Sequence, residues 1–262
     1  LQHAHRRPRD RILPAGEKPL SYDVSVVMAT YKRPELLARC LNALTHQTFD
    51  ASRYEIIVVD NNSVDATASI AREHGVIVIT ETNQGMAWAR DAGFNHATGD
   101  IPPRLDADCG APFEWIDKIT THYQNQPIME SAGISGMGYY TTKSVLIGKI
   151  AGTLVTGGYH LGSRLMLRND VLFGSCMAFP RAWWNEIKDE ACKDSHAVHE
   201  DFDLTAHLLT KGHLVQRLPG FYTYIDTRTL HESPKKTLWR YKIWPEAARR
   251  HRKELRAARS AK

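Results

Sequence analysis

Two carboxylates stand two residues apart in the stretch RLDADCG, at residues 104–110. Asp106 and Asp108 follow a pair of prolines and come just before a glycine. Carboxylates this close repel each other unless a cation lies between them. Their oxygens suit a hard divalent ion, Mg²⁺ or Mn²⁺, that keeps some of its waters and binds phosphates. An Asx-type turn without metal explains the same pair, so the doublet alone is weak evidence for a metal site.

A second group of acids lies in the stretch VHEDFDLTAHLLTKG, at residues 198–212. Glu200, Asp201 and Asp203 come directly before leucines at helical spacing, so we expect them in the first turn of a helix. Acids at that position interact favourably with the helix dipole, so helix stability alone explains their presence. The alternative is a carboxylate that removes a proton during a reaction.

The first half of the chain alternates short apolar runs with amphipathic segments. Runs rich in Val and Ile predict strands that are buried on both faces, and apolar residues at helical spacing predict helices between them. This order implies parallel strands joined by right-handed crossovers, which is an α/β fold. The predicted strands cover residues 23–30, 54–63 and 76–80, and the predicted helices cover residues 33–47, 64–75 and 85–100.

Polar residues follow two of these strands at their carboxyl ends, where parallel sheets bind ligands. Thr30 and Tyr31 follow the first strand, and Asp60 with two asparagines follows the second. Turn formation alone also explains them. Neither G-x-G-x-x-G nor a P-loop follows any strand. Pro102 and Pro103 cannot donate to a ladder, so we expect any strand before the acid doublet to be short or to lie at a sheet edge.

The composition is that of a globular protein, with 262 residues, 42% hydrophobic and 24% charged. The four cysteines are scattered, which favours reduced, packed thiols over disulfides. No uncharged apolar run reaches about 18 residues, which argues against a membrane-spanning helix. No signal peptide is visible, and we expect a cytoplasmic protein.

The net charge of +5 is unevenly distributed. Residues 1–20 carry +3 and residues 234–262 carry +9, which leaves −7 for residues 21–233. A nucleic-acid-binding protein more usually spreads positive charge over its folded surface, so we expect no nucleic-acid partner. The basic tail also holds two tryptophans and a tyrosine, and this mixture predicts attachment at an anionic membrane surface. A merely solvated end is the alternative.

Five short motifs occur in a fixed order along most of the chain: VSVVMATYKRPELLARCLNAL, IIVVDNNSVDAT, NQGMAWARDAGFNHATGD, LDADC and HEDFDL. In this order the chain resembles the family 2 glycosyltransferases with the GT-A fold. The resemblance implies a Rossmann-like, mostly parallel sheet flanked by helices, with an acceptor-side subregion and a basic C-terminal helix. It implies a single catalytic domain at 21–233, with a nucleotide-sugar half at 21–130 and an acceptor half at 131–233, between a basic extension at 1–20 and a tail at 234–262.

The resemblance also implies a reaction, the inverting transfer of a sugar from a nucleoside diphosphate, with UDP expected, to a hydroxyl of a saccharide or lipid-linked acceptor. Asp201 would be the general base and Glu200 its neighbour, although the sequence does not decide between the two acids. Asp108 would hold Mg²⁺ or Mn²⁺ on the leaving diphosphate. The resemblance implies further residues at the donor site. Thr30 and Tyr31 would line the nucleotide pocket, and Asp60 would hydrogen-bond the nucleobase. Arg90 would approach the nucleotide or its phosphates, and Asp106 would face the sugar or ribose.

The stretch FGSCMAFPRAWW resembles the family segment that closes the donor site from the acceptor side. Gly174 and Ser175 would allow a close backbone approach there. Trp183 and Trp184 could stack on a sugar, although packing in the core explains them at least as well. His231 lies where some GT-A enzymes bring a further metal or phosphate ligand, and a surface or core histidine is the alternative.

Residues 144–168 are apolar but are interrupted by charged residues and glycines, so they do not suit a membrane span. They predict either a buried helical hairpin or an interfacial surface that meets a lipid-linked or membrane-embedded acceptor.

Two other functions stay open from the sequence. One is a nucleotidyltransferase of similar fold, although no Gly-rich loop follows the first strand. The other is a catalytically inactive module that binds nucleotide sugars or a membrane surface. Hydrolysis of a sugar nucleotide by the purified protein would distinguish an enzyme from such a module.

Overall fold

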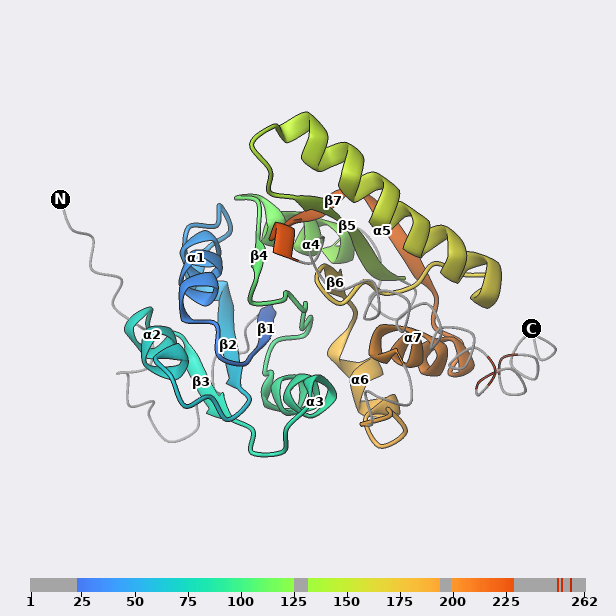
Figure 1. Cartoon of the computed structure of the whole chain (residues 1–262). Helices are drawn as coiled ribbons and strands as arrows, with labels where there is room; N and C mark the ends of the chain where they lie inside the picture. The colour runs from blue at the N-terminus through green and yellow to red at the C-terminus, as the bar shows by residue number, and fades with distance from the viewer. Residues whose placement is uncertain are drawn as a thin grey trace.

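The structure is a computed structural model that describes residues 23–124, 132–193 and 199–228, with residues 249, 251 and 255. It has an α/β architecture in which helices flank the strands (Figure 1). The strands are β1 (Val24–Thr30), β2 (Tyr54–Asp60), β3 (Ile77–Thr80), β4 (Cys109–Gly110), β5 (Gly133–Tyr140), β6 (Met177–Ala178) and β7 (Val215–Ile225). The helices are α1 (Pro34–Thr45), the 3-10 helix η2 (Ala51–Arg53), α2 (Thr67–Glu73), α3 (Met86–His96), α4 (Trp115–Gln124), α5 (Val145–Leu167), α6 (Arg181–Ile187) and α7 (Glu200–Thr210).

The predicted alternation of strands and helices in the first half is confirmed. β1, β2 and β3 pair in parallel in that order, and α1 and α2 connect them. The register places Thr30 beside Asp60 and Asp60 beside Thr80. The polar residues expected at the carboxyl ends of the strands therefore lie next to one another at one edge of the sheet.

The two faces of β1 contribute to different hydrophobic cores, as in a strand between two helical layers. Val26 and Met28 pack in one core with Leu37 of α1. Val27 packs on the other side, in a core that includes Phe94 of α3. This double burial explains why the sequence of β1 is a continuous apolar run and not an alternating one.

The proline-containing segment at residues 101–105 lies between β1 and β6, so of the two expected alternatives, a short strand or an edge position, the structure shows the short strand. On one side Arg104 bridges to Val27 of β1, and on the other it bridges to Met177 of β6. The pairing is short, as expected, because the prolines have no N–H: Pro103 accepts a hydrogen bond from Val27 and cannot return one. The segment connects the strands β1–β3 to the other half of the sheet.

That other half has the strand order β4-β7-β5-β6. β5 and β7 are parallel, whereas β4 and β6 pair antiparallel with their neighbours. The acid doublet stands immediately before β4, and β4 pairs with the end of β7. Asp226, which follows β7, therefore lies beside Asp108 and donates its backbone N–H to the Asp108 carbonyl.

Residues 145–167 form one helix of 23 residues, so the alternative of a buried hairpin is wrong. This helix, α5, runs across the top of the molecule and packs on β5 (Figure 1). A Cβ on Gly148 would clash with the Tyr140 carbonyl. A Cβ on Gly152 would clash with the Gly138 carbonyl in the same way. The missing side chains let the helix lie directly on the strand and leave its opposite face exposed.

The cysteines and the adjacent pair of tryptophans are packed inside the protein, except for the partly exposed Cys192. All four cysteines are free thiols, and Cys40, Cys109 and Cys176 are buried, as expected for packed thiols. Trp183 and Trp184 are fully buried in the core that contains Phe94 and Phe179, which favours the packing alternative over stacking on a sugar.

Candidate active site

One arginine connects the two acidic groups. The Nη2 atom of Arg104 lies 3.1 Å from Oδ1 of Asp106 and 2.8 Å from Oε1 of Glu200. Its Nη1 atom lies 3.2 Å from Oδ1 of Asp201. The acid doublet and the first turn of α7, which are far apart in the sequence, therefore belong to one site.

Arg104 reaches both groups because its segment lies between β1 and β6, close to the start of α7. A guanidinium has five N–H donors in a planar fork, so one side chain can bind several carboxylates. Although burial disfavours the charged form, the three carboxylates, Glu200 most of all, raise the pKa of Arg104 and keep it protonated. One positive charge against three negative charges leaves the site attractive to a cation. Sequence analysis missed Arg104, although it stands directly before the LDADC motif.

Asp201 is oriented by contacts to both of its oxygens. Oδ1 accepts from Arg104, and Oδ2 accepts a hydrogen bond of 2.9 Å from the N–H of Gly174. A Cβ on Gly174 would lie 2.5 Å from Oδ1, so a larger residue would displace the carboxylate. Burial raises the pKa of Asp201 even though Arg104 opposes the rise. A raised pKa suits a carboxylate that accepts a proton.

Gly174 and Ser175 together hold carboxylates from both acidic groups. Ser175 Oγ donates a hydrogen bond of 2.6 Å to Oδ2 of Asp106, next to the bond from Gly174 to Asp201. The Asp106 side chain keeps 26% of its surface exposed, so it is accessible from solvent. The second oxygen of Glu200, Oε2, is buried and has no hydrogen-bond partner within the described parts of the chain.

Asp108 is bound by two surface arginines. Its Oδ2 lies 2.8 Å from Nη1 of Arg33 and 3.1 Å from Nη2 of Arg228. Burial and the nearby Asp106 raise the pKa of Asp108, and the two arginines oppose this rise. Sequence analysis missed both arginines. Arg33 stands three residues after β1, near the expected ligand edge, whereas Arg228 carries no motif that points to it.

The three residues expected in the nucleotide pocket lie together at the carboxyl ends of β1 and β2. Thr30 pairs with Asp60, and both Asp60 oxygens accept hydrogen bonds of 3.2 and 3.3 Å from the N–H of Ser63. Tyr31 follows Thr30 and is 42% exposed. The loop that contains Tyr31 continues to Arg33, which reaches Asp108. The edge where the nucleotide is expected is therefore continuous with the acid doublet.

Arg90 is not on this accessible edge. Its side chain is fully buried, and Nε and Nη2 bind Oδ1 of Asp91 at 2.9 and 2.7 Å. Among the described residues, Nη1 of Arg90 and Oδ2 of Asp91 have no hydrogen-bond partner. Contact between Arg90 and a nucleotide would require this pair to move. His231, the other metal ligand considered from sequence, lies outside the described residues.

The model of the glycosyl transferase family 2 matches residues 25–182. Among curated proteins, the glycosyltransferase AglE of Haloferax volcanii is 39% identical over 101 residues, which cover 36% of this chain and 33% of AglE. An undecaprenyl-phosphate 4-deoxy-4-formamido-L-arabinose transferase of Sodalis glossinidius is 36% identical over 113 residues, which cover 38% of this chain and 34% of that protein. The matched stretches span about a third of the length of these relatives.

Solved structures with a similar fold include two that were determined with sugar nucleotides. The mannosyltransferase PcManGT from Pyrobaculum calidifontis, in complex with GDP-Man and Mn²⁺, has a TM-score of 0.60 at 17% identity and covers 94% of this chain and 80% of that one. S. aureus TarS 1–349, in complex with UDP-GlcNAc, has a TM-score of 0.60 at 16% identity and covers 78% of this chain and 58% of that one. At these identities the similarity shows the GT-A fold alone.

Proposed function

The chain belongs to glycosyl transferase family 2, and from this premise we propose that it moves a sugar from a nucleoside diphosphate, expected to be UDP, to an acceptor hydroxyl with inversion. One observation supports this most strongly: Arg104 holds Asp106 and Asp201 in the same site. The reaction needs a place for a leaving diphosphate beside a carboxylate that accepts a proton. The acid doublet and the start of α7 have the chemistry for these two parts.

Asp108 would hold a divalent cation, Mg²⁺ or Mn²⁺, and Asp106 beside it would contact the sugar or ribose of the donor. Carboxylate oxygens are the ligands that such hard ions prefer, and the Asp108 side chain is partly exposed. A bound ion would supply positive charge that stabilises the leaving diphosphate. Arg33 and Arg228, which now neutralise Asp108, are roughly half exposed and can turn toward phosphate oxygens. The structural neighbour bound to GDP-Man and Mn²⁺ supports this assignment.

Asp201 is the residue we assign as general base. The Gly174 N–H and Arg104 hold its carboxylate in place, and burial raises its pKa toward the range useful for proton transfer. Removal of the hydroxyl proton lets the oxygen attack the anomeric carbon from the face opposite the diphosphate, which inverts the configuration. Glu200 is the second candidate because its Oε2 has no hydrogen-bond partner in the described residues.

Two isosteric variants, Asp201→Asn and Glu200→Gln, test the assignment of the base. Asp201→Asn should lower the transfer rate by about 10²- to 10⁴-fold, the usual contribution of a general base. It should keep the thermal shift that nucleotide diphosphates cause with Mn²⁺, because the donor side is intact. Glu200→Gln should keep most of the transfer rate. A large loss of transfer rate in Glu200→Gln with little loss in Asp201→Asn would make Glu200 the base. Wild-type rates in both variants would rule out catalysis by this acid pair.

Removal of the divalent ion tests the donor side separately. Asp108→Asn should lose the Mn²⁺-dependent part of the thermal shift caused by UDP or GDP. Transfer by the wild-type protein should stop in excess EDTA and recover when Mn²⁺ or Mg²⁺ is added. Sugar transfer that continues in EDTA would contradict the role of the metal.

The exposed face of α5 supports an acceptor at a membrane surface. Leu154 is 72% exposed and Leu165 is 76% exposed. The helix contains Lys149 and Arg164 and no acidic residue, a combination that suits an anionic lipid surface. Other large apolar residues exposed along the same helix are Val145, Leu146, Ile147, Ile150, Val155 and Leu161.

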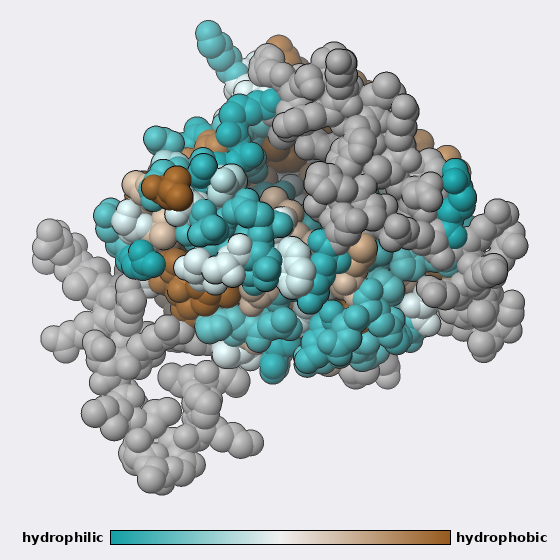
Figure 2. Space-filling model, turned by 60° about the horizontal axis from the view of Figure 1, so that its bottom comes forward, coloured by the Kyte–Doolittle hydropathy of each residue, from teal (hydrophilic) through white to brown (hydrophobic). Residues whose placement is uncertain are grey.

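The opposite end of the molecule has a different character. Figure 2 brings forward the bottom of Figure 1, and the described residues on that face are mostly hydrophilic with small separate apolar areas. Within the described ranges, no helix is long and apolar enough to cross a bilayer. We therefore place α5 at the level of the lipid headgroups, with a lipid-linked acceptor. The transferase from Sodalis glossinidius, whose name includes undecaprenyl phosphate, supports this choice.

A further inference from the structure

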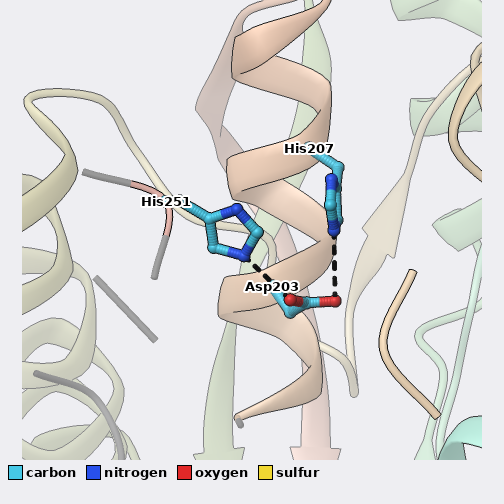
Figure 3. Close-up of side chains that lie close together, drawn as sticks. All are labelled: Asp203, His207 and His251. Atoms are coloured by element: carbon cyan, nitrogen blue, oxygen red, sulfur yellow. Dashed lines mark hydrogen bonds and ion pairs between the residues drawn. The ribbon is translucent and has the colours of Figure 1, made fainter. Parts of the chain in front are cut away.

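Three buried side chains converge behind the first turn of α7. Asp203 and His207 lie four residues apart on one face of the helix, and His251 approaches from the C-terminal segment. Figure 3 shows the two imidazole rings and the carboxylate pointing toward one another. The relative exposures are 2% for Asp203, 8% for His207 and 6% for His251. The residues proposed for catalysis, Glu200 and Asp201, are not part of this cluster.

The ligand atoms of the three residues are close enough to share one ion. Nε2 of His251 lies 2.9 Å from Oδ1 of Asp203. Nε2 of His207 lies 3.7 Å from Oδ2 of the same carboxylate, and all three ligand atoms fall within 4.8 Å of one another. A tetrahedral zinc ion with bonds of about 2.0–2.1 Å has ligand atoms about 3.3 Å apart. The two carboxylate–imidazole separations, 2.9 and 3.7 Å, lie on either side of that value and involve different oxygens of Asp203. Rotations of the side chains would bring one oxygen and two nitrogens around a single ion.

The carboxylate of Asp203 offers an oxygen to each histidine. Its Oδ1 faces Nε2 of His251 and its Oδ2 faces Nε2 of His207, and the Asp203 side chain is only 3% exposed. A buried carboxylate is an oxygen ligand that favours a positively charged partner.

Neighbouring groups orient two side chains of the cluster, Asp203 and His207, as the hydrogen-bonding neighbours of metal ligands do in proteins. The N–H of Cys192 donates a hydrogen bond of 2.8 Å to Oδ2 of Asp203. Nδ1 of His207 lies 3.5 Å from Oε2 of Glu190, on the side of the ring that faces away from Asp203. A carboxylate that binds the second nitrogen of a histidine fixes its tautomer and strengthens the first nitrogen as a ligand.

From this geometry we propose a zinc site formed by Asp203, His207 and His251, independent of the proposed glycosyl transfer. Two imidazoles and one carboxylate are ligands that Zn²⁺ takes in proteins, with a fourth position left for water. The acid doublet offers oxygens only and suits Mg²⁺ or Mn²⁺, so the two sites select different ions. The ion would bind residue 251 to α7, the helix that starts with Glu200 and Asp201, and would stabilise the folded protein.

Cobalt spectroscopy tests this site without any measurement of transfer. Tetrahedral Co²⁺ bound by nitrogen absorbs visible light far more strongly than Co²⁺ bound by six oxygens. The full chain, stripped with a chelator, should gain the intense absorption with one equivalent of Co²⁺ and lose it when Zn²⁺ is added. His207→Gln and His251→Gln should each abolish the intense absorption, because both remove an imidazole and keep a hydrogen-bonding side chain of similar reach.

Two control variants show whether the absorption arises at this cluster. His213→Gln should keep the absorption, because His213 binds Glu186 at 2.9 Å and stacks on Trp183 away from the cluster. Asp108→Asn should also keep it, because the donor site supplies only oxygen ligands. The proposal is wrong if the wild-type protein gives only the weak octahedral absorption, or if both histidine variants retain the intense one. That result would leave the three residues as a hydrogen-bonded contact without metal.

A measurement on the unmodified protein covers the case in which the variants do not fold. X-ray absorption of the zinc-loaded wild-type chain reports imidazole ligands through their characteristic outer-shell scattering. Two imidazoles with an oxygen at about 2.0–2.1 Å would support the site. A shell of oxygens alone would overturn it.

Discussion

At the scale of residues, the site depends on how one buried charge balances several opposite ones. Asp106, Glu200 and Asp201 repel one another, and their closeness costs free energy unless a cation lies between them. Arg104 supplies that charge from the protein itself and holds the three carboxylates close together. We infer that Arg104 is a positioning residue that aligns the proposed donor side with the proposed general base.

Replacement of Arg104 should therefore destabilise the fold. Arg104→Met keeps much of the volume but leaves buried carboxylates unpaired, which should lower the free energy of unfolding by about 3–5 kcal/mol at pH 7. This loss of stability should become smaller as the pH falls toward 5. Without Arg104 the pKa of Asp201 rises further above its unfolded value, and protonation then favours the folded state. Urea denaturation at both pH values measures the effect.

Arg39→Met is the matched control for that experiment. Arg39 also pairs with a carboxylate, Asp226, but its side chain is 65% exposed and the pair is screened by water. Loss of this ion pair should lower the free energy of unfolding by no more than about 1 kcal/mol. Equal stabilities of the two variants would contradict the structural importance of Arg104.

The pH dependence of transfer should report the base directly. A general base must be deprotonated, and burial raises the pKa of Asp201 above its ordinary value of 3.8. With donor and Mn²⁺ saturating, kcat should fall tenfold for each pH unit below the raised pKa and level off above it. A rate profile that stays flat down to pH 4 would exclude Asp201 with a raised pKa as the base. Initial rates between pH 4 and 9 provide the test.

At the scale of elements, α5 shows how glycines decide which face of a helix is buried. Gly148 and Gly152 lie one turn apart and face β5, where any side chain would meet the backbone of the strand. The apolar residues of α5 are therefore left on the outer face, although in the sequence they look like a core pattern. Hydrophobicity alone allowed either a buried hairpin or an exposed interfacial surface, and the close backbone contact at the glycines decided which face of the helix is buried.

Two alanine substitutions in α5 should have opposite effects. Gly152→Ala places a methyl group against the Gly138 carbonyl and should cost about 1–3 kcal/mol through overpacking. Gly158→Ala has no atom within 4 Å of the new methyl group and should stabilise the helix by up to about 1 kcal/mol. Thermal unfolding of the two variants measures the difference. Equal effects would mean that α5 does not rest on β5 as described.

At the scale of the whole molecule, the exposed apolar residues of α5 and the uneven net charge along the sequence both bear on membrane binding. The exposed side of α5 lies on one end, while the residues at 21–233 carry a net charge of −7 and the tail at 234–262 carries +9. An acidic body is repelled by anionic lipid, whereas an apolar helix and a basic tail are attracted to it. Binding to a membrane should therefore combine a salt-sensitive contribution from the tail with a salt-resistant one from α5.

Vesicle sedimentation should resolve these two contributions. Leu154→Asp together with Leu161→Asp should reduce binding to vesicles of phosphatidylcholine with phosphatidylserine at both low and high salt, because the exposed apolar face is interrupted. Raising the salt to about 1 M, where the Debye length is about 3 Å, should weaken the binding of the wild-type protein to the vesicles only partly. Val64→Asp, at an exposed apolar residue away from α5, serves as the control. Unchanged binding of the double variant would remove α5 from the membrane contact.

Much of the fold was determined by local patterns in the sequence. Continuous apolar runs specified buried strands, residues at helical spacing specified the helices between them, and polar residues marked the carboxyl ends at Thr30 and Asp60. The motif order also predicted that the acid doublet and Asp201 share a site, and the contacts of Arg104 agree with that prediction. The strands, the helices and the polar strand ends depend on neighbours a few residues away, so they can be read along the chain, whereas the shared site was implied by the family resemblance.

Only the tertiary structure decided which distant side chains pair. The contacts of Arg104 require residues 101–105 to lie between β1 and β6, and the burial of Arg90 depends on how α3 packs in the core. The cluster with His251 joins α7 to a segment more than forty residues away, without any spacing that would identify it. Burial and pairing of charges depend on how whole elements pack. The strength of an ion pair depends on how much water the packing removes from around the two charges.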